Sequence, residues 1–395
     1  MKTLNSTIFN QIKFQVNPNQ FKKLPSLRRS FHSNLNLYNQ NQNQDEKKIL
    51  KPPHLLTLAD LSINEIQSLV SYAINAKKIV KDHSISHSND LSNLHTNSDP
   101  NEIKAIKNKL LNNKTIGLMF SKRSTRTRIA SESSINLLGG HALFLGPNEI
   151  QLGVNESLFD TAKVVSSMID GIMARVGDHS EIELLAENST VPVINALSSL
   201  YHPTQILASL VTLLETFFPH SRNLSSLNGL NIAWIGDSNN VLNDMIVSYP
   251  RLGINLNIAT PKGYELEPRV LERMKLGLVE DSDVHRGGKL LHFHDPLEAI
   301  KDADVIVTDT WISMGQEDEM KRRLKDFEGY QITEELCKMG NAKNNWKFMH
   351  CLPRHQDEVD DQVFYGPRSL VFQEAENRKW TILSVFEAYF GRWMK

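Results

Sequence analysis

Short hydrophobic runs alternate with segments of helical spacing from residue 115 onward, and this alternation is what most restricts the possible fold. Runs rich in Val, Ile and Leu are typical of strands buried on both faces, whereas hydrophobic residues three and four apart predict helices. We expect strands at 115–120, 142–145, 171–176, 191–194, 232–235, 256–259, 290–293, 305–308 and 346–349, and helices at 126–138, 157–169, 203–217, 241–252 and 377–390. Such alternation predicts parallel sheets with helices on both faces.

This many strands suits two doubly wound α/β domains, and a chain of 395 residues is long enough for both. A long helix beginning at Pro203 is the natural connection between the two sheets, because proline is favoured at the first position of a helix. Before the sheets, Ser62 and Glu65 form the pattern of a capping box, and hydrophobic residues with helical spacing follow. Residues 83–103 are rich in Ser, Asn, His and Asp, which predicts a surface loop.

The first 44 residues differ in composition from the rest of the chain. They contain lysines and arginines but neither Asp nor Glu, and Ser, Asn and Gln fill much of the remainder. A basic segment without acidic residues is typical of a mitochondrial transit peptide, with Arg28–Ser33 as a candidate processing region, and it predicts the mitochondrial matrix as destination. A disordered Asn/Gln-rich tail is the alternative.

The overall charge and the cysteine count exclude several classes of function. Lys and Arg number 44 and Asp and Glu 45, a balance that gives no reason to expect nucleic acid or a membrane surface as partner. The two cysteines, Cys337 and Cys351, cannot form a zinc cluster, and we expect no metal site. The chain also lacks an apolar run of about 18 residues that could span a membrane.

Polar residues lie at or shortly after the ends of five of the predicted strands. These residues are Ser124–Arg128, Arg175, Asp237–Asn240, Asp309 and Cys351. Open α/β sheets bind ligands at the carboxyl ends of their strands. We therefore expect one active site in a cleft between the two domains.

The segment Ser121–Arg128 leaves a strand and enters a helix. Its hydroxyl groups, its backbone N–H groups and the positive end of the helix favour a phosphate, and arginines add charge-assisted hydrogen bonds. A basic helix start with Ser and Thr caps is the alternative for such a run taken alone.

Several motifs, in the same order along the chain, resemble those of the aspartate/ornithine carbamoyltransferase family. They are Ser-Thr-Arg-Thr-Arg at 124–128, His-Pro-Thr-Gln at 202–205, Asp309 with Ser313 and Met314, His-Cys-Leu-Pro at 350–353, and Glu-Asn-Arg at 376–378. The resemblance covers roughly residues 50–391. It implies a carbamoyl-phosphate-binding domain (50–200 plus 376–395) and an ornithine-binding domain (201–375).

The resemblance also implies the residues that bind carbamoyl phosphate. Arg175, Thr127 and His202 would donate to the carbonyl oxygen, on which negative charge grows during the reaction, and Gln205 would hold the carbamoyl NH₂ through its amide oxygen. Arg126, His202 and Cys351 are the candidate catalytic residues. The full implied set is Ser124, Thr125, Arg126, Thr127, Gln151, Arg175, His202, Gln205, Cys351, Leu352 and Arg378. A helix cap is the alternative for His202–Gln205, and a solvated helix charge is the alternative for Arg378.

His-Cys-Leu-Pro, where aspartate-specific members have His-Pro-Leu-Pro, resembles the ornithine branch of the family. The implied ornithine contacts are Asn240, Asp309, Ser313 and Met314, with Cys351 positioning the δ-amine and assisting its deprotonation. Buried filler is the alternative for Cys351, and a helix N-cap is the alternative for Asp309. The family commonly has Gly where this chain has Ser238.

The activity implied is transfer of a carbamoyl group from carbamoyl phosphate to L-ornithine, giving citrulline and phosphate, as in arginine biosynthesis and the urea cycle. No cofactor is needed, because the leaving group is already activated. A loop carrying Gln151 enters the neighbouring subunit's site in this family, which implies a homotrimer. Alternatives are another acceptor, such as putrescine or aspartate, and a catalytically silent relative.

Overall fold

A computed structural model describes residues 52–85, 104–148, 156–281, 287–312 and 319–394. The predicted transit peptide (1–44) lies outside these ranges, as does most of the predicted loop at 83–103. The backbone of helix α2 (Ile63–Ile85) continues to residue 85, so the first residues assigned to that loop are helical. None of the helices in the described ranges has both the length and the hydrophobicity needed to cross a bilayer.

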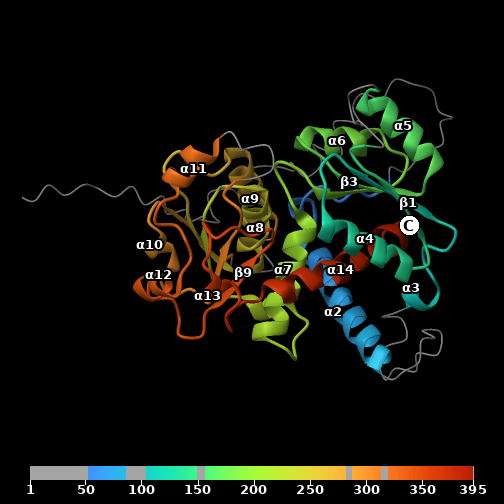
Figure 1. The fold of residues 1–395 in the computed structure, drawn as a ribbon. Helices are drawn as coiled ribbons and strands as arrows, with labels where there is room; N and C mark the ends of the chain where they lie inside the picture. Colours follow the sequence, from blue (N-terminus) through green and yellow to red (C-terminus); the bar gives the residue numbers. More distant parts are fainter. Residues whose placement is uncertain (1–51, 86–103, 149–155, 282–286, 313–318, 395) are drawn as a thin grey trace, which may run out of the picture.

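Two separate sheets, both parallel throughout, form the centres of two halves of the molecule (Figure 1). The first has the order β2-β1-β3-β4, and the second has the order β7-β6-β5-β8-β9. The strands are β1 (Thr115–Phe120), β2 (His141–Leu145), β3 (Gly171–Arg175), β4 (Val193–Leu197), β5 (Asn231–Ile235), β6 (Asn255–Ala259), β7 (Leu290–Phe293), β8 (Val305–Thr308) and β9 (Lys347–His350). The predicted α/β class with two parallel sheets is confirmed.

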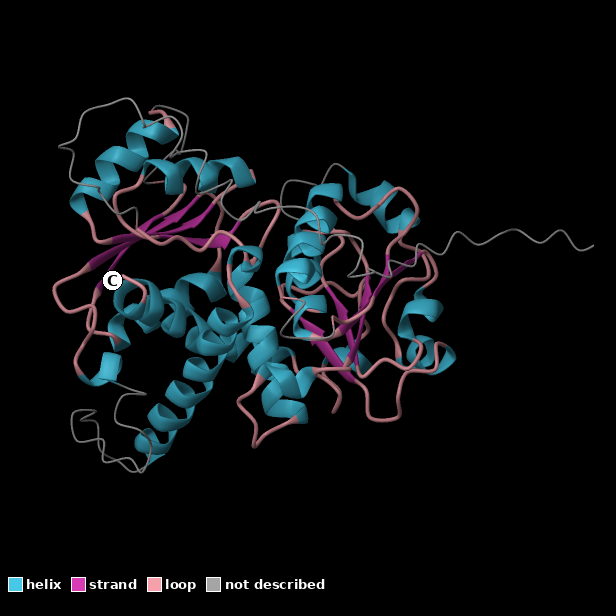
Figure 2. Ribbon diagram, turned by 180° about the vertical axis from the view of Figure 1, so that it is seen from behind, coloured by secondary structure: helices cyan, strands magenta, loops and turns pink. Residues whose placement is uncertain are grey.

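Helices cover both faces of each sheet (Figure 2). On the first sheet, α5 and α6 lie on one face, while α4 and α14 lie on the other. The remaining bounds are α3 (Lys104–Lys107), α4 (Thr125–Leu137), α5 (Leu158–Met168), α6 (His179–Asn188), α7 (Pro203–Phe217), α8 (Asn240–Ser248), α9 (Pro268–Glu280), α10 (Pro296–Ile300), α11 (Met320–Asp326), α12 (Glu334–Met339), α13 (Asp361–Phe364) and α14 (Val371–Glu387).

Helix α7 begins at Pro203, as predicted, and connects the two sheets. Helix α14 returns from the second half to the first and packs along α7, α4 and α2. A partly buried polar cluster joins three of these helices: Lys77 Nζ donates to Glu215 at 2.8 Å and to Asn377 Oδ1 at 2.7 Å. The connection between the halves therefore consists of two antiparallel helices, and a boundary at residue 376 falls inside α14.

The strand order places a topological switch point at the centre of each sheet. In the first sheet the chain moves outward from β1 in one direction to β2 and in the other to β3, and in the second it does the same from β5 to β6 and β8. The loops after β1 and β3, and after β5 and β8, therefore diverge and leave a crevice. These are the loops that carry the predicted site residues.

The turn after β5 has a backbone that only glycine accommodates easily. Gly236 has φ +147°, and a Cβ there would lie 3.0 Å from Thr308 Oγ1. The buried indole of Trp234 donates to the carbonyl of Asp237 at 3.0 Å, and Thr308 Oγ1 donates to the carbonyl of Ile235 at 2.5 Å. These bonds fix the path of the chain from β5 to the first residues of α8.

Candidate active site

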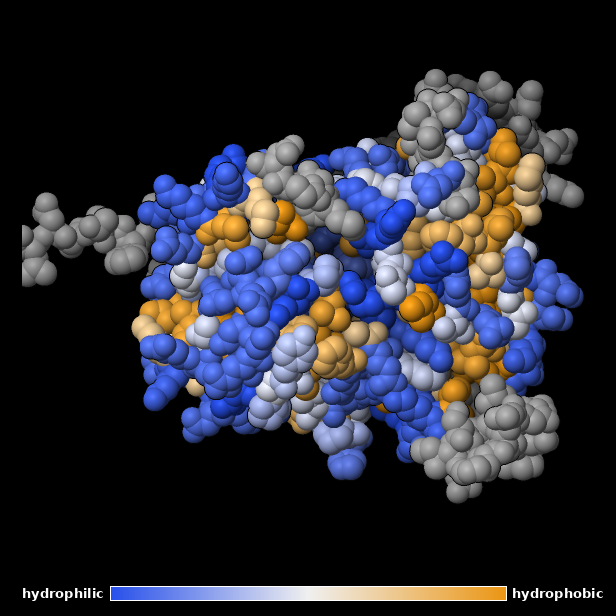
Figure 3. Space-filling model, viewed as in Figure 1, coloured by the Kyte–Doolittle hydropathy of each residue, from blue (hydrophilic) through white to orange (hydrophobic). Residues whose placement is uncertain are grey.

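The two halves of the predicted site meet through a direct hydrogen bond. Arg126, in the first turn of α4, donates from Nη2 to the carbonyl oxygen of Leu352 at 2.5 Å. Leu352 follows β9 and has φ +63°, a left-handed conformation that is strained for a branched side chain. Hydrophilic residues line a hollow between the two halves of the surface (Figure 3).

The start of α4 has the features of an anion site. Ser124 is the N-cap residue, its side chain makes no capping hydrogen bond, and the first turn contains no acidic residue. The hydroxyl of Ser124 is therefore not committed to the helix, and the positive end of the helix is not neutralised by a carboxylate. Thr127 is buried one turn into the helix and accepts a hydrogen bond from Arg378 Nη2 at 3.2 Å.

Arg378 is buried at the centre of this half of the site, so it is not a solvated helix charge. It is only 3% exposed, and its Nη1 donates to Gln205 Oε1 at 2.8 Å. Nη2 also faces Thr204 Oγ1 at 3.3 Å. Burial, together with the like charges of Arg126 and Arg175, lowers the pKa of Arg378 to about 10, so the guanidinium remains charged at neutral pH.

His202, the N-cap residue of α7, is buried among three arginines. Burial first, and then the positive charges of Arg378, Arg175 and Arg126, lower the pKa of His202 well below its ordinary value. The imidazole is therefore neutral at physiological pH and can donate only one N–H. Its side chain makes no capping bond to the helix, which excludes an ordinary side-chain cap.

Buried polar atoms without hydrogen-bonding partners gather around His202. Among the described residues, these include His202 Nδ1, Arg175 Nε and Arg378 Nε. A buried guanidinium or imidazole nitrogen without a partner is costly, and native proteins retain such groups mainly where a ligand, ion or water completes the bonding. Burial also lowers the pKa of Arg175, and Arg126 adds to this effect. These donors therefore lie where an anionic, oxygen-rich ligand would satisfy them.

The other half of the site is built around Asp309, which follows β8. Asn239 Nδ2 donates to Asp309 Oδ2 at 2.8 Å, and the thiol of Cys351 donates to Oδ1 at 2.9 Å. Burial and the charge of Asp309 raise the pKa of Cys351 well above its ordinary value, so the sulfur is a protonated thiol here. Asp309 is not a helix N-cap, because no helix follows it directly.

Asn240, at the first residue of α8, reaches across to the first half of the molecule. Its Nδ2 donates to the carbonyl of Ser198 at 2.6 Å. Three predicted site residues, Gln151, Ser313 and Met314, lie outside the described residues. Within the described ranges, no group of three or more His, Cys, Asp or Glu side chains has a geometry suited to a metal ion.

Sequence reasoning gave no individual role to two residues that support these side chains. Asn239 caps α8 by accepting from the N–H groups of Val241 and Leu242, and its amide nitrogen holds Asp309. Asp244 is completely buried and accepts from the N–H group of His202 at 2.6 Å and from Thr57 Oγ1 at 2.8 Å. The N-cap position of Asn239 was available as a signal, whereas nothing in the local pattern of α8 marks Asp244.

Replacing Asp244 by alanine should lower the free energy of unfolding by about 1–3 kcal/mol for each buried donor that loses its acceptor and finds no water. Urea denaturation measures this change. Glu187→Ala is the control, because Glu187 is an exposed residue of α6. A loss no larger than in this control would mean that water satisfies the N–H group of His202.

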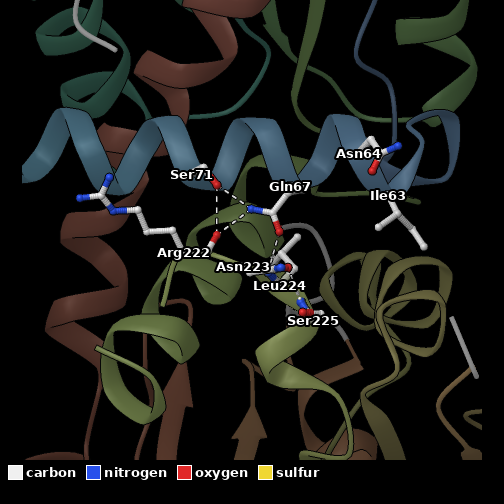
Figure 4. Close-up of a pocket in the computed structure, with 8 residues that line it drawn as sticks. All are labelled: Ile63, Asn64, Gln67, Ser71, Arg222, Asn223, Leu224 and Ser225. Atoms are coloured by element: carbon white, nitrogen blue, oxygen red, sulfur yellow. Dashed lines mark hydrogen bonds between the residues drawn. The ribbon is translucent and has the colours of Figure 1, made fainter. Parts of the chain in front are cut away.

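A separate pocket lies between α2 and the loop at 221–225 (Figure 4). Gln67 occupies its centre, where Nε2 donates to the carbonyl of Arg222 at 2.6 Å and Oε1 accepts from the N–H group of Leu224. Ser71 also donates to the carbonyl of Arg222. Gln67 and Ser71 thus fasten the loop to α2.

Two family models match nearly all of the described chain. The model for the carbamoyl-P binding domain of the aspartate/ornithine carbamoyltransferases matches residues 53–215, and the model for the Asp/Orn binding domain matches residues 228–389. The chain belongs to the aspartate/ornithine carbamoyltransferase family. Members of this carbamoyltransferase family bind carbamoyl phosphate in the first domain and an amino acid in the second.

Individual members of the family are similar to this chain over most of its length. The mitochondrial ornithine carbamoyltransferase of Emericella nidulans is 50% identical over 340 residues, which cover 86% of this chain and 89% of the relative. The mitochondrial ornithine transcarbamylase of Gallus gallus is 48% identical, with 85% of each chain covered. The crystal structure of the mitochondrial ornithine carbamoyltransferase from Coccidioides immitis superimposes with a TM-score of 0.73 at 46% identity, covering 86% of this chain and 97% of the other.

Proposed function

We propose that the chain is an ornithine carbamoyltransferase, which transfers the carbamoyl group of carbamoyl phosphate to the δ-amine of L-ornithine and releases citrulline and phosphate. One observation supports this proposal most strongly. Arg175 and Arg378, whose Nε atoms have no hydrogen-bond partner among the described residues, lie on one side of the contact between Arg126 and Leu352. The hydrogen-bonded pair of Asp309 and Cys351 lies on the other side. The relatives named above carry this activity in their names, and they are about half identical to this chain.

Carbamoyl phosphate binds to the first half of the site in this proposal. Its phosphate lies at the start of α4, against Ser124, Thr125, Arg126 and Thr127, while Arg175 and His202 donate to its carbonyl oxygen. A neutral His202 suits this role, because it donates an N–H group without adding a fourth positive charge. The amide oxygen of Gln205 already accepts from Arg378, and its second lone pair remains for the carbamoyl NH₂.

L-Ornithine binds to the second half. The carboxylate of Asp309 receives the α-ammonium group, with Asn240, Ser313 and Met314 as further contacts. The neutral δ-amine attacks the carbamoyl carbon, the C–N bond forms, and the C–O bond to phosphate breaks. The attacking nitrogen gives up one proton, which the departing phosphate accepts. Arg126 and its neighbours stabilise the charge that leaves with the phosphate. Positioning of two bound substrates supplies much of the acceleration.

Cys351 positions the δ-amine beside the carbamoyl group. Its hydrogen bond to Asp309 holds the sulfur on the amine side, and as a thiol it is a weak donor and acceptor. A thiolate that removes a proton from the amine would need a large fall in its pKa when the substrates bind, because the pKa is raised here.

Cys351→Ser should therefore weaken ornithine use more than carbamoyl phosphate use. Serine keeps a donor for Asp309, but its Cβ–Oγ bond is shorter than the Cβ–Sγ bond of cysteine, so its hydroxyl lies farther from the δ-amine. We expect KM for ornithine to rise several-fold, which is on the order of the loss of one hydrogen bond to the amine. Initial rates at varied ornithine and at varied carbamoyl phosphate measure the two constants. Unchanged ornithine affinity and turnover would make Cys351 a packing residue.

A second acceptor is disfavoured by the chemistry of Asp309. Putrescine has no α-amino acid end for this carboxylate to bind, and aspartate would bring a carboxylate toward it. Parallel assays with ornithine, putrescine and aspartate test the proposal, and only ornithine should be carbamoylated efficiently. Folded protein that makes no citrulline from carbamoyl phosphate and ornithine would overturn it.

We further propose a homotrimer in which the loop carrying Gln151 completes a neighbouring site. Exposed hydrophobic residues of α4, β2 and α5 favour self-association, and hydrophobic residues gather over the α5 side of the molecule in Figure 3. These residues are Ile129, Leu143, Phe159, Val164 and Met168. Light scattering of the purified protein measures the assembly.

The domain division at 50–200 plus 376–395 and 201–375 is likewise a proposal, supported by the separation of the two sheets between β4 and β5. We place the protein in the mitochondrial matrix, because the named relatives are mitochondrial enzymes and the first 44 residues have the composition of a transit peptide. Microscopy of these residues fused to a fluorescent protein tests the compartment.

A further inference from the structure

Glu374 is a completely enclosed carboxylate that no step of the proposed reaction uses. It lies in the first turn of α14 and is 2% exposed. One of its oxygens, Oε1, accepts two hydrogen bonds, from Gln205 Nε2 at 2.9 Å and from Ser209 Oγ at 2.5 Å. A buried carboxylate is costly, so its retention here points to a function for its bonds.

The bonds of Glu374 decide which way the amide of Gln205 faces. An amide has an oxygen and a nitrogen end of nearly the same shape, and only its partners distinguish them. Glu374 accepts from the nitrogen end, while Arg378 Nη1 donates to the oxygen end at 2.8 Å. Glu374 and Arg378 are four residues apart on α14, so they lie on one face of that helix and clamp the amide together.

Glu374 also lies near the end of β9, which packs against α14. The backbone N–H group of His350, at the end of β9, is among the groups that favour its ionised form, as are Ser209, Gln205 and Arg378. Burial acts against them and is the largest effect, and the pKa of Glu374 rises to about 7. Oε2 is buried without a hydrogen-bond partner among the described residues, so the hydrogen bonds of the carboxylate run to α7, which carries Gln205 and Ser209.

We propose that Glu374 is a positioning residue for the carbamoyl end of the donor: it holds the Gln205 amide with Oε1 turned toward Arg378 and toward the place of the carbamoyl NH₂. This inference rests on the proposed function. It assigns to Glu374 no contact with substrate and no proton transfer. Glu374 acts through Gln205, so its replacement should not change the binding of the phosphate group of the donor.

The substitution Glu374→Gln keeps the shape of the side chain and removes the carboxylate. An amide at this position can still turn its oxygen toward Gln205 and Ser209, because Oε2 of Glu374 makes no hydrogen bond to a described residue that the NH₂ group would break. What the substitution removes is the negative charge, so the hydrogen bonds that hold the Gln205 amide change from charge-assisted to weaker neutral bonds.

Two probes separate the ends of the donor in this variant. Phosphonoacetamide carries both a phosphonate and an amide, whereas inorganic phosphate carries only the anion. By titration calorimetry, Glu374→Gln should bind phosphonoacetamide several-fold and at most about 10-fold more weakly, because the neutral hydrogen bond from the amide NH₂ of this probe to Gln205 is less well oriented. Affinity for inorganic phosphate should be unchanged. Glu376→Gln, an exposed residue of the same helix paired with Lys81, is the matched control and should bind both probes normally.

A general structural role predicts a different pattern, with both probes weakened and a lower melting temperature. Equal loss of both affinities, or no loss of either, would overturn the inference. Gln205→Ala gives a further test, because adding Glu374→Gln to it should cause little additional loss of phosphonoacetamide affinity if the two residues act together. Additive losses would show that Glu374 acts by another route.

If Glu374→Gln does not fold, Ser209→Ala tests the same carboxylate from its other partner. The hydroxyl of Ser209 lies within hydrogen-bonding distance of Glu374 Oε1 and of the carbonyl of Gln205, and its loss should weaken the binding of phosphonoacetamide but not that of phosphate. Unchanged phosphonoacetamide affinity in that variant would count against the inference. Wild-type protein that binds neither probe and makes no citrulline would instead overturn the proposed function.

Discussion

Arg126→Ala should lower the turnover of citrulline formation by about 10²- to 10³-fold, the usual loss when one preorganised donor to developing charge is removed. Arg126 lies in the first turn of α4 with its guanidinium directed at the junction of the two halves. In the proposed reaction it binds the phosphate as negative charge builds on the leaving oxygen. A charged donor there contributes more to the transition state than to the bound substrate.

The fold should survive this substitution. The side chain of Arg126 is only partly buried, and its hydrogen bond to the carbonyl of Leu352 is worth about 1 kcal/mol of stability. Circular dichroism and thermal melting would establish that the variant is folded before its rate is compared with that of the wild type.

Arg128→Ala is the matched control for Arg126→Ala. Arg128 belongs to the same motif and the same helix, but it is exposed, pairs with Glu132 at 2.8 Å, and lies over the ring of Phe144. Surface ion pairs contribute about 0–1 kcal/mol, so this variant should remain active. Near-wild-type turnover in Arg126→Ala, or an equal loss in both variants, would contradict the assigned anion site.

The sequence predicted the sheets better than the helices that cover them. Strands β1, β7 and β8 begin and end where the hydrophobic runs do, because strands buried on both faces must be apolar throughout. Helix α6, His179–Asn188, was missed although Ile182, Leu185 and Ala186 have helical spacing and Asp178 caps its start. Helix α9 was missed although Pro268 and its spacing could have signalled it.

Motifs identified residues that would touch the substrates but not those that hold them in place. Arg126, His202 and Cys351 stand in short strings whose chemistry can be recognised locally. Glu374 and Asp244 act through partners 169 and 42 residues away, Gln205 and His202. A carboxylate in an amphipathic helix gives no local sign that it is buried, since this depends on which elements pack against it.

The pKa of Cys351 could not be read from the sequence either. Neighbouring groups can raise or lower the pKa of a thiol near the end of a strand, and a nearby cation would have lowered it and favoured the thiolate. The structure places the carboxylate of Asp309 closer, at 2.9 Å, so the thiol is favoured. The raised pKa disfavours the expectation that Cys351 assists deprotonation, while its positioning role stays a prediction.

Asp309→Asn should raise KM for ornithine by about 30-fold or more, the equivalent of about 2 kcal/mol for a charge pair that loses one partner. Asparagine keeps the size of the side chain, and its oxygen can still accept from Asn239. The negative charge that would meet the α-ammonium group of ornithine is removed. The change therefore tests the attraction between Asp309 and the α-ammonium group apart from the hydrogen bonds that Asp309 accepts from Asn239 and Cys351.

Two measurements distinguish these contributions. Affinity for phosphonoacetamide should be nearly unchanged in Asp309→Asn, because the donor binds to the arginine cluster in the other half of the site. The slow carbamoylation of putrescine, which has no α-amino acid end, should lose far less than that of ornithine. If the substitution weakened both acceptors equally, Asp309 would act by holding Cys351 in place, and the recognition of the α-ammonium group would belong to another residue of the cleft.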